Sequence, residues 1–591
     1  MTKSQRVPVL IVGGGGAGLT ASMLLGTHGI ESLLVSALPT TSILPKAHVL
    51  NQRAMEVFSD VGVAEAIYAR STPGAHMSHT GWYLDVAGDQ DAGRLIHKME
   101  SWDGGYTDPA WIAASPCRQA NLPQIRLEPI LRARAEHLNS GRVRFGHELL
   151  SLEQDARGVT AMVRDLEGGT DYEVRADYLL GCDGGRTVGR LVGIQLDGQR
   201  DLMRSASVHM TADLSPWLRD DDVLIRWIVH TRYGGAFSAL VAMGPERWGR
   251  ASEEWVFHMT YPPDLEPLFD TDEKAIGVMR ERLGLPDLDI KVHVITRWRV
   301  EGLVAPATRV GRVFLLGDAA HRHPPTGGLG LNSAVHDAHN LCWKLAQVLR
   351  GTAGDALLDT YHPERFPSFA RNMQRSIENA LNHLELVEAL GIKASITPEE
   401  CRRNVRQLWE KGPESDARRE QVARVMATQS MEFKEHNVEF GFRYTSDAVI
   451  PDDSPEPAAL DDVRLYQPDT RPGSPLPHAW VERAGTRVPL RQVAPPSSFT
   501  LIAGEDGAAW CRAARDAAAR RGIELVAIRV GHTEGEWLDP RLAFLRVREF
   551  GREGAILVRP DRVIAWRSMG AAADPGRELG AAIDRILARA A

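Results

Sequence analysis

The segment from Gly317 to Leu345 constrains the fold of this chain more than any other. It reads GDAAHRHPPTGGLGLNSAVHDAHNLCWKL and joins an acidic turn, a glycine-rich loop and the start of a helix. The apolar run 313–316 before it is typical of a buried strand, which puts Asp318 at the carboxyl end of that strand, where ligands collect in open α/β sheets. From Asn332 onward apolar residues recur at helical spacing, so free N–H groups at the helix start favour a negatively charged ligand. The segment therefore predicts a site for a large polar cofactor.

The amino terminus carries a second cofactor signal. Gly13, Gly15 and Gly18 stand at GxGxxG spacing between an apolar strand and a helical pattern over residues 19–25, and another strand pattern follows at 32–35. This order predicts a βαβ unit. Its first glycine permits a tight turn, the second lets the backbone approach a pyrophosphate, and the third lets helix and strand pack closely. A plain glycine-rich turn is the alternative, and the flanking strands and helix argue against it.

Composition restricts the class of protein. Residues 7–26 carry no charge and place Gly14 and Gly18 in the GxxxG spacing of membrane helices. Four consecutive glycines would each cost a helix about 1 kcal/mol, so we expect no membrane span, no signal peptide and a cytoplasmic protein. The net charge of −8, without a long Lys/Arg run, argues against nucleic acid as a partner. The five cysteines form no CxxC pair, so no metal site or disulfide framework is expected.

A third acidic turn stands between the other two. Asp183-Gly184 follows an apolar strand pattern that begins at Tyr178, and Arg190 lies shortly after it. The combination of GxGxxG, a DG turn and GD with a GLGLN loop resembles the flavin-dependent aromatic hydroxylases, the single-component (class A) FAD monooxygenases. The segments PKAHVLNQRAMEVF, LPQIRLEPIL, HRHPPTGGLG and LLDTYHPER are similar to the phenol hydroxylase branch that includes 2,4-dichlorophenol 6-monooxygenase. The similarity extends over most of the chain, including its carboxyl-terminal part.

This resemblance implies a mixed α/β fold: a Rossmann-like FAD-binding domain with an interleaved β-sheet substrate domain, followed by a thioredoxin-like C-terminal domain. The FAD-binding part is expected at 1–75, 100–200 and 295–375, and the substrate sheet at 76–99 and 201–294. Residues 376–450 are charged and helical and are expected to form a connector. In the tail, 451–591, strand patterns are expected at 499–503, 524–530 and 555–566, with a helix at 508–521. The tail has no CxxC and only Cys511, so packing or oligomerisation is the expected role rather than redox exchange.

The resemblance also implies which residues hold FAD. They are Gly13, Gly15, Gly16, Ala17, Gly18, Ser36, Lys46, Gln124, Asp183, Asp318, Gly328, Gly330, Leu331 and Asn332. Two positions depart from the family: Lys46 stands where relatives have a phosphate-contacting Arg, and Ser36 where many have a ribose-binding Glu. A lysine can serve as a point charge, and a hydroxyl would bind ribose more weakly. For Asp183, capping of its own turn is the alternative to cofactor contact.

The implied chemistry is hydroxylation of an aromatic ring. NAD(P)H reduces FAD, O2 adds to the reduced ring, and the C4a-hydroperoxyflavin delivers oxygen to an electron-rich arene. Because a phenolate reacts better than a phenol, a group must take or relay the hydroxyl proton. His48 is the candidate, since it occupies the position where phenol hydroxylases place a substrate-contacting Asp, and an imidazole with a pKa of about 6.5 suits the task. The alternative is that His48 only packs or bonds locally.

Walls for the substrate are expected from the middle of the chain. Residues 223–230 and 254–260 have the alternating or mostly apolar pattern of strands. Arg226 and Trp227 are candidates to contact an anion or a ring, although a Trp on a strand is more often core. By resemblance, the backbone carbonyl of Pro324 lines the reaction side.

Several alternatives remain at this stage. A flavin-dependent halogenase would need a WxWxIP-type segment, and no two tryptophans stand at that spacing. A flavoprotein oxidase or reductase would carry the same cofactor motifs, and a non-enzymatic binding module would not need three of them. Both a (chloro)phenol in catabolism and a larger phenol- or hydroxypyridine-bearing metabolite suit the expected enzyme. Its expected partners are therefore a small aromatic substrate, O2 and further copies of the same chain.

Overall fold

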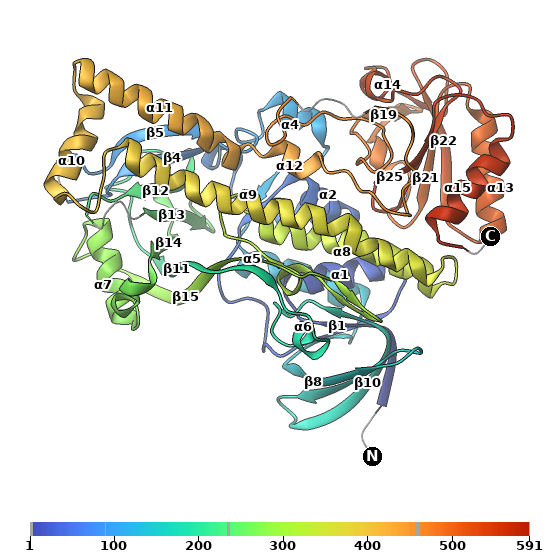
Figure 1. The fold of residues 1–591 in the computed structure, drawn as a ribbon, viewed down its shortest axis with the longest axis horizontal. Coiled ribbons are helices and arrows are strands. Elements are labelled where there is room, and N and C mark those ends of the chain that lie inside the picture. The colour runs from blue at the N-terminus through green and yellow to red at the C-terminus, as the bar shows by residue number, and fades with distance from the viewer. Residues whose placement is uncertain (1–3, 89, 233–236, 456–459, 590–591) are drawn as a thin grey trace.

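Three large β-sheets organise the chain in the computed structural model, which describes residues 4–88, 90–232, 237–455 and 460–589 (Figure 1). The first sheet lies below the long crossing helices α8 and α9, the second lies to their left, and the third forms the tail at the right of the view. The fold is mixed α/β, as the sequence predicted.

The first sheet is built around parallel strands. Its order is β16-β17-β10-β1-β2-β7, with β8 and β9 attached to β10. The strands are β1 (Ser4–Val12), β2 (Ser32–Ser36), β7 (Val143–Phe145), β8 (His147–Gln154), β9 (Val159–Asp165), β10 (Thr170–Gly181), β16 (Arg309–Val310) and β17 (Val313–Leu315). Because β2, β1, β10 and β17 pair in parallel, their carboxyl ends share one edge. Helices that cover or flank this sheet are α1 (Gly16–Thr27), α2 (Gln52–Asp60), α3 (Ala64–Tyr68), α5 (Gln124–Leu138), α6 (Val188–Leu191) and α8 (Leu329–Leu349).

The second sheet lies between helices on both faces. Its order is β18-β15-β11-β14-β13-β12-β4-β5. The strands are β4 (His79–Leu84), β5 (Arg94–Glu100), β11 (Asp197–Thr211), β12 (Val223–Val229), β13 (Phe237–Gly244), β14 (Glu254–Tyr261), β15 (Lys291–Val304) and β18 (His321–Arg322). One face packs on α7 (Asp272–Leu283), and the other on α9 (Tyr361–Ala389), α10 (Pro398–Arg406) and α11 (Pro413–Phe433). Strands β11 and β15 run across residues 200 and 295, the boundaries expected between the FAD-binding part and the substrate sheet.

The tail forms the third sheet. Its order is β20-β19-β23-β22-β21-β24-β25. The elements are β19 (Trp480–Arg483), β20 (Thr486–Pro489), β21 (Phe499–Ala503), α13 (Ala508–Arg521), β22 (Leu525–Gly531), β23 (Trp537–Leu538), α14 (Ala543–Val547), β24 (Ala555–Val558), β25 (Ile564–Ser568) and α15 (Pro575–Ile586). The core of β21, α13, β22, β24, β25 and α15 has the βαβ and ββα order of a thioredoxin-like fold. Residues 555–566, expected as one strand, form a hairpin instead, because the polar stretch from Arg559 to Arg562 makes a turn.

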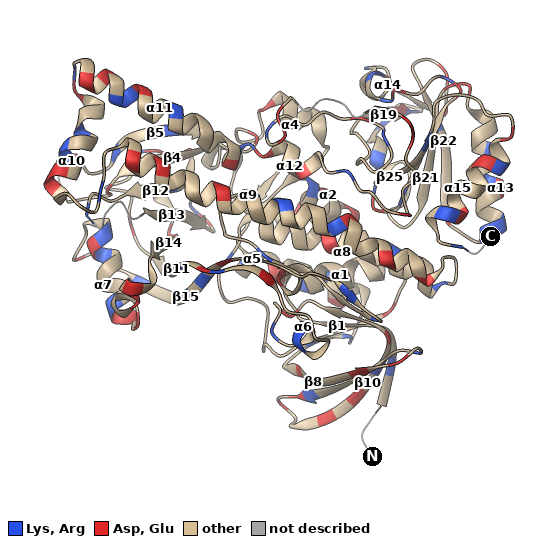
Figure 2. Cartoon of the chain, in the orientation of Figure 1, with Lys and Arg blue, Asp and Glu red and all other residues tan. Residues whose placement is uncertain are grey.

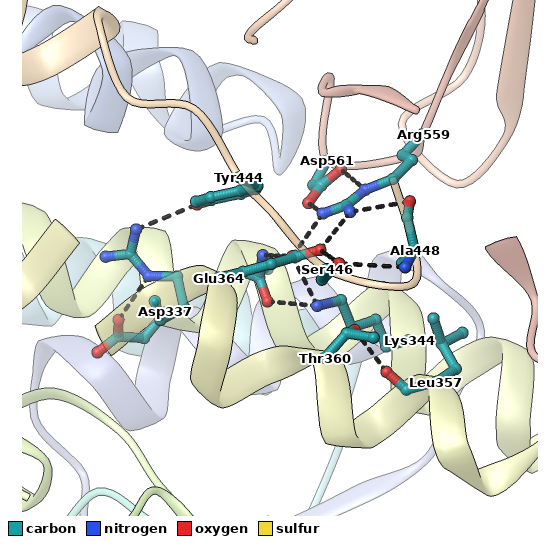
Figure 3. Close-up of polar contacts among 12 residues, drawn as sticks. Asp337, Lys344, Leu357, Thr360, Glu364, Tyr444, Ser446, Ala448, Arg559 and Asp561 are labelled. Carbon is teal, nitrogen blue, oxygen red and sulfur yellow. Dashed lines mark hydrogen bonds and ion pairs between the residues drawn. The ribbon is translucent and has the colours of Figure 1, made fainter. Parts of the chain in front are cut away.

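A buried ionic network fixes the tail to the helices beneath it (Figure 3). Arg559, from the tail hairpin, donates two hydrogen bonds of 2.6 and 2.9 Å to the carboxylate of Glu364 on α9. Lys344 on α8 donates to the same carboxylate at 2.8 Å, and Asp561 pairs with Arg559. Burial alone would raise the pKa of Glu364, but the charges of Arg559 and Lys344 hold it well below its ordinary range. The tail is therefore joined to the cofactor-side helices by charges that have no access to water.

Charges on the outside of the molecule are mixed in sign. Figure 2 shows acidic and basic residues interspersed along α10, α11, α13 and α15, while the middle of the second sheet is nearly free of charge. Among the described residues, no helix combines the length and apolar character needed to cross a bilayer.

Gly18 provides a test of the turn geometry. A Cβ atom at this position would lie 1.9 Å from the Gly13 carbonyl oxygen, whereas a Cβ on Gly277 in α7 would meet nothing within 4 Å. We expect Gly18→Ala to destabilise the protein by about 1–3 kcal/mol through overpacking, and Gly277→Ala to be neutral or stabilising by up to about 1 kcal/mol. Chemical unfolding midpoints compare the two variants. Equal midpoints would contradict the close helix–strand approach.

Candidate active site

The three predicted turns meet at the carboxyl edge of the first sheet. The Gly13 N–H donates to the carbonyl of Val35 at 2.8 Å, and the Cys182 N–H donates to Val12 at 2.8 Å. The Leu316 N–H donates to Gly181 at 3.0 Å, which brings the third turn alongside. Segments that lie far apart in the sequence therefore form one continuous rim, as expected for parallel strands that end at the same edge.

Two helices begin at this rim without a side-chain cap. Helix α1 starts after Gly15 and α8 after Gly328, and because both N-cap residues are glycines, neither helix has an N-cap side chain to bond its first N–H groups. The two starts touch, because a Cβ added to Gly16 would lie 2.6 Å from Leu331 Cδ1. A Cβ added to Gly330 would meet no atom nearer than His323 Nδ1, at 3.9 Å. A Cβ added to Gly317 would lie 3.1 Å from the Cβ of Ala17, so the third turn also lies against α1. Free N–H groups from both helices thus face one region and favour an anionic ligand.

The two acids at the rim have different environments. The Asp183 carboxylate accepts backbone N–H bonds from Gly185, Thr187 and Val188 at 3.1, 2.6 and 2.8 Å. With these bonds Asp183 caps its own turn, which is the alternative to cofactor contact given for this residue above. Asp318 is exposed, and its carboxylate has no hydrogen bond or ion pair within the described part of the chain. Its oxygens are therefore available to accept bonds from hydroxyl groups of a ligand.

Helix α5 holds the loop that carries Lys46. Gln124 accepts a hydrogen bond from the Ala47 N–H at 3.2 Å and donates to Glu128 at 2.9 Å. Lys46 itself is exposed and has a left-handed backbone, φ +44°. Its ammonium group is therefore free to reach toward an anion at the rim.

Glu128 was not identified from the sequence. It is buried, accepts a 2.7 Å bond from the Ser42 N–H, and lies 3.7 Å from where a Cβ on Gly15 would be. Burial raises the pKa of this carboxyl, although hydrogen bonds from Ser42, Gln124 and Gly16 and the charge of Lys46 oppose the shift. The i, i+4 spacing of Gln124 and Glu128 on one helix face is the signal that could have revealed it.

Asn332 ties the glycine-rich loop to the strand after His48. Its side chain accepts from the Asn51 N–H at 3.0 Å and donates to the carbonyls of Val49 and Gly328 at 3.1 and 2.8 Å. These bonds occupy the side-chain amide of Asn332, so this amide holds the loop in place rather than being free for a ligand. Ser36 is buried at the end of β2. A Cβ atom added to Gly14 would lie 3.0 Å from the Cβ of Ser36.

His48 lies where the two large sheets face each other. Its Nδ1 is 2.5 Å from Asn121 Oδ1, on the short strand β6 (Ala120–Asn121), which pairs with β3 (Val49–Leu50). Burial lowers the pKa of His48, and the bond to Asn121 opposes this shift. Burial lowers the pKa of His258 on β14 to about 4, and repulsion from His48, when that residue is protonated, adds to the shift. At neutral pH His48 is therefore an uncharged imidazole with a fixed partner.

The two candidates for the substrate wall point to opposite faces of the second sheet. Trp227 packs in the apolar cluster that also contains Val49, with its ring 4.1 Å from that of His383. Arg226 is 1% exposed on the α7 face, where it donates to the Val223 carbonyl at 2.9 Å and lies over Trp255. The expectation that Arg226 contacts substrate is therefore wrong, because neighbours on a strand alternate between faces. Pro324 is buried in the loop between β18 and α8.

Asp337 on α8 supports the third turn from behind. Its carboxylate accepts bonds from the Gly317 N–H at 3.0 Å, from His321 at 2.7 Å and from Arg365 at 2.9 Å. Burial alone would raise the pKa of Asp337, but His321 and Arg365 hold it well below its ordinary range. Asp337 was not identified from the sequence, because its role depends on a contact with a distant residue, Arg365 on α9. Arg365 is the neighbour of Glu364, which belongs to the network that holds the tail.

One further cluster lies at the edge of the second sheet. His209, Glu254 and His293 have possible ligand atoms within 4.8 Å of one another. However, Arg126 donates to the Glu254 carboxylate at 2.6 Å, on the oxygen that also bonds His209 at 2.9 Å. Because the guanidinium already compensates the carboxylate, we interpret the cluster as an ion-pair network rather than a metal centre.

Comparisons with known proteins agree with this geometry. The family model described as FAD binding domain matches residues 6–376, and the model described as aromatic-ring hydroxylase, C-terminal, matches residues 469–590. The 2,4-dichlorophenol 6-monooxygenase of Delftia acidovorans is 36% identical over 98% of each chain. The solved structure of the flavin-dependent monooxygenase PieE with FAD and substrate has a TM-score of 0.91 at 38% identity, covering 99% of each chain. Aklavinone-11 hydroxylase with FAD and aklavinone has a TM-score of 0.78 at 31% identity, covering both chains fully.

Proposed function

The chain belongs to the family of FAD-dependent aromatic-ring hydroxylases, and from this premise we propose how its own residues divide the work. The protein is an FAD-dependent aromatic monooxygenase. Its relatives include an enzyme named for 2,4-dichlorophenol and one solved with aklavinone. A (chloro)phenol in catabolism and a larger secondary metabolite both fit this family.

FAD would be held at the carboxyl edge of the first sheet. The glycines of the first turn and the N-termini of α1 and α8 supply N–H groups for its pyrophosphate and for the negative charge of its reduced ring. Lys46 adds a cation, and Asp318 accepts from ribitol hydroxyls. The glycine N-caps of both helices, and an Asp318 carboxylate without a partner among the described residues, support this fit. When bound, FAD supplies the redox and oxygen-transfer chemistry, with NAD(P)H and O2 as co-substrates.

The aromatic ring would lie between His48 and the inner face of the second sheet. Trp227 and the cluster around Val49 supply an apolar wall, and the Pro324 backbone borders the same space. His48 takes the hydroxyl proton, because an uncharged imidazole is a proton acceptor near neutral pH. We also propose that the enzyme acts in the cytoplasm and as an oligomer of identical chains.

The single observation that carries the function is the convergence of the three turns and two free helix starts on one rim beside the second sheet. Reaction under isotopically labelled dioxygen tests it. The label is expected in the ring hydroxyl of the product. Label found only in hydrogen peroxide, with no oxygenated product from any arene, would instead mean a flavoprotein oxidase.

His48 provides a separate prediction. His48→Ala is expected to keep bound FAD but to lose hydroxylation by roughly a hundredfold or more at neutral pH. Part of the activity should return at higher pH, where the phenol ionises without help. Product formation across a pH series measures this, with His137→Ala on the exposed end of α5 as the control. Unchanged rate and coupling in His48→Ala would remove His48 from the mechanism.

A further inference from the structure

A short chain of hydrogen bonds holds His48 from the side of β6. His48 directly precedes β3, and β3 pairs with β6, the strand that carries Asn121. The Leu122 N–H donates to the His48 carbonyl at 2.7 Å, and the Thr72 N–H donates to the Asn121 carbonyl at 3.0 Å. Thr72 and Asn121 are both buried. Asn121 therefore lies between Thr72 and His48, with its backbone fixed on both sides.

The side-chain bonds of Asn121 give its amide a direction. Asn121 Nδ2 donates to Thr72 Oγ1 at 2.7 Å. The Thr72 hydroxyl is directed to the main-chain carbonyl of Asn121, at 3.4 Å, which leaves a lone pair of Oγ1 to accept from the amide. With its NH2 group turned to Thr72, the amide presents Oδ1 to His48 Nδ1, at 2.5 Å. Because a carbonyl oxygen only accepts, the hydrogen between these two atoms belongs to His48 Nδ1.

This assignment decides which nitrogen of His48 is the base. A neutral imidazole carries one ring hydrogen, so a hydrogen on Nδ1 leaves the lone pair on Nε2. Nε2 has no hydrogen bond among the described residues, and the His48 side chain is only partly buried. In the opposite tautomer, Nε2 would carry the hydrogen and could only donate to a phenol.

No nearby charge competes with Asn121 for control of the ring. Burial lowers the pKa of His48, and the bond to Asn121 opposes this shift. Across the site, His258 on β14 is uncharged at neutral pH because its pKa is about 4. In the loop before α8, burial first and then the charge of a neighbouring histidine hold the pKa of His323 well below its ordinary value. On the loop of His48 itself, the Lys46 side chain is exposed.

We propose that Asn121 is a positioning residue that fixes the His48 imidazole in the orientation and tautomer in which Nε2 takes the hydroxyl proton of the substrate. Thr72 fixes Asn121 in turn. This deepens the proposed function and rests on it. In the step, the phenol O–H bond breaks, its electron pair stays on the oxygen, and an N–H bond forms at Nε2. The imidazolium keeps its Nδ1–H bond to Asn121, and the added proton leaves from Nε2 to water.

Two substitutions separate the acceptor role of Asn121 from the space it fills. Asn121→Asp keeps an acceptor of the same size, and its negative charge should raise the pKa of His48 by about 1 unit or more. Since His48 must be neutral to accept a proton, activity in this variant should be lost at a higher pH as the pH falls. Asn121→Leu removes the bond that raises the pKa of His48, so this pKa should fall, and the hydrogen is no longer held on Nδ1.

Nitrogen NMR of the FAD-loaded enzyme with isotope-labelled histidine measures the tautomer and the pKa of His48 without a substrate. The signals of His48 are those missing in His48→Ala. In the wild type above this pKa, we expect Nδ1 to have the shift of an N–H nitrogen and Nε2 that of a bare nitrogen. Asn121→Asp should keep this pattern with a raised pKa, and Asn121→Leu should show a mixture of tautomers. A hydrogen on Nε2 in the wild type overturns the proposal.

Product formation from phenols and hydroxypyridines links the tautomer to catalysis. Above the pKa of His48, Asn121→Leu should lose roughly tenfold to a hundredfold, a part of what a general base supplies, while Asn121→Asp stays near the wild-type rate. Asn139→Leu is the matched control, because it removes another buried amide, which bonds Ser22 at the opposite end of α5. Its pH profile should be that of the wild type.

Equal losses in Asn121→Asp and Asn121→Leu overturn the proposal, because the aspartate retains the acceptor. A wild-type rate and pH profile in Asn121→Leu overturn it as well. If the wild type oxygenates no ring, the proposed function fails, and the nitrogen shifts still decide which tautomer Asn121 holds.

Discussion

Replacing Asp318 by alanine is expected to yield folded protein that is largely free of FAD. The Asp318 carboxylate is exposed at the carboxyl edge of the first sheet and has no partner among the described residues, so its loss should change stability by less than about 0.5 kcal/mol. A hydrogen bond to a charged group contributes about 1.5–3 kcal/mol, so FAD binding should weaken by roughly tenfold to a hundredfold. The ratio of flavin to protein absorbance after purification, and an FAD titration of the apoprotein, measure the effect.

Asp447→Ala is the matched control, because the Asp447 side chain is 93% exposed and lies far along the chain from the rim turns. This variant should purify with full flavin. Full yellow occupancy in Asp318→Ala would contradict the assignment of the third turn to the cofactor.

The second large effect is expected at the joint between the tail and the cofactor-side helices. Arg559→Met leaves two buried carboxylates, Glu364 and Asp561, against one cation, Lys344. Breaking a buried pair by removing one partner costs about 3–5 kcal/mol, because a charge remains buried without compensation. The free energy of unfolding in urea, followed by tryptophan fluorescence, should fall by this amount.

Arg541→Met removes the same side chain from an exposed pair in the same domain. Arg541 Nη1 lies 2.9 Å from Glu482 Oε1, and the two side chains are 52% and 36% exposed. The free energy of unfolding should therefore fall by less than about 1 kcal/mol. Equal losses in the two variants would mean that the buried network contributes no more to stability than a surface pair.

Local patterns were sufficient to predict the cofactor half of the molecule. The glycine turn, its flanking strand and helix, and the start of α8 follow from residue spacing within short windows, and the structure confirms these elements. Their convergence on one edge also follows, because consecutive parallel strands of an open sheet end on the same side. The family resemblance supplied the rest of the expected fold.

The errors have equally local causes. Arg226 and Trp227 were both proposed as wall residues, although adjacent residues on a strand must face opposite ways, so one of the two assignments had to fail. Residues 555–566 were predicted as one strand because their apolar content concealed the turn at Arg559 to Arg562. That turn carries the charges that join the tail to Glu364.

The contact between the helical connector and the cofactor side of the molecule could not be predicted from local pattern. Gln119 and Glu435 are more than 300 positions apart, and their juxtaposition depends on how the short helix α12 (His436–Phe440) packs against the loop that precedes α5. In the sequence Glu432, Glu435 and Glu439 look like charges of a solvated helix, but each is only 5% exposed. Only the tertiary structure shows that they are buried next to the site.

The measurement that tests the central claim most directly is NADPH consumption by the purified yellow protein against a panel of phenols and hydroxypyridines, with peroxide and oxygenated product quantified together. The account predicts that at least one member of the panel accelerates NADPH consumption and that oxygenated product accounts for most of it. Steady consumption that yields only peroxide with every ring would contradict the account and identify the protein as a flavin oxidase.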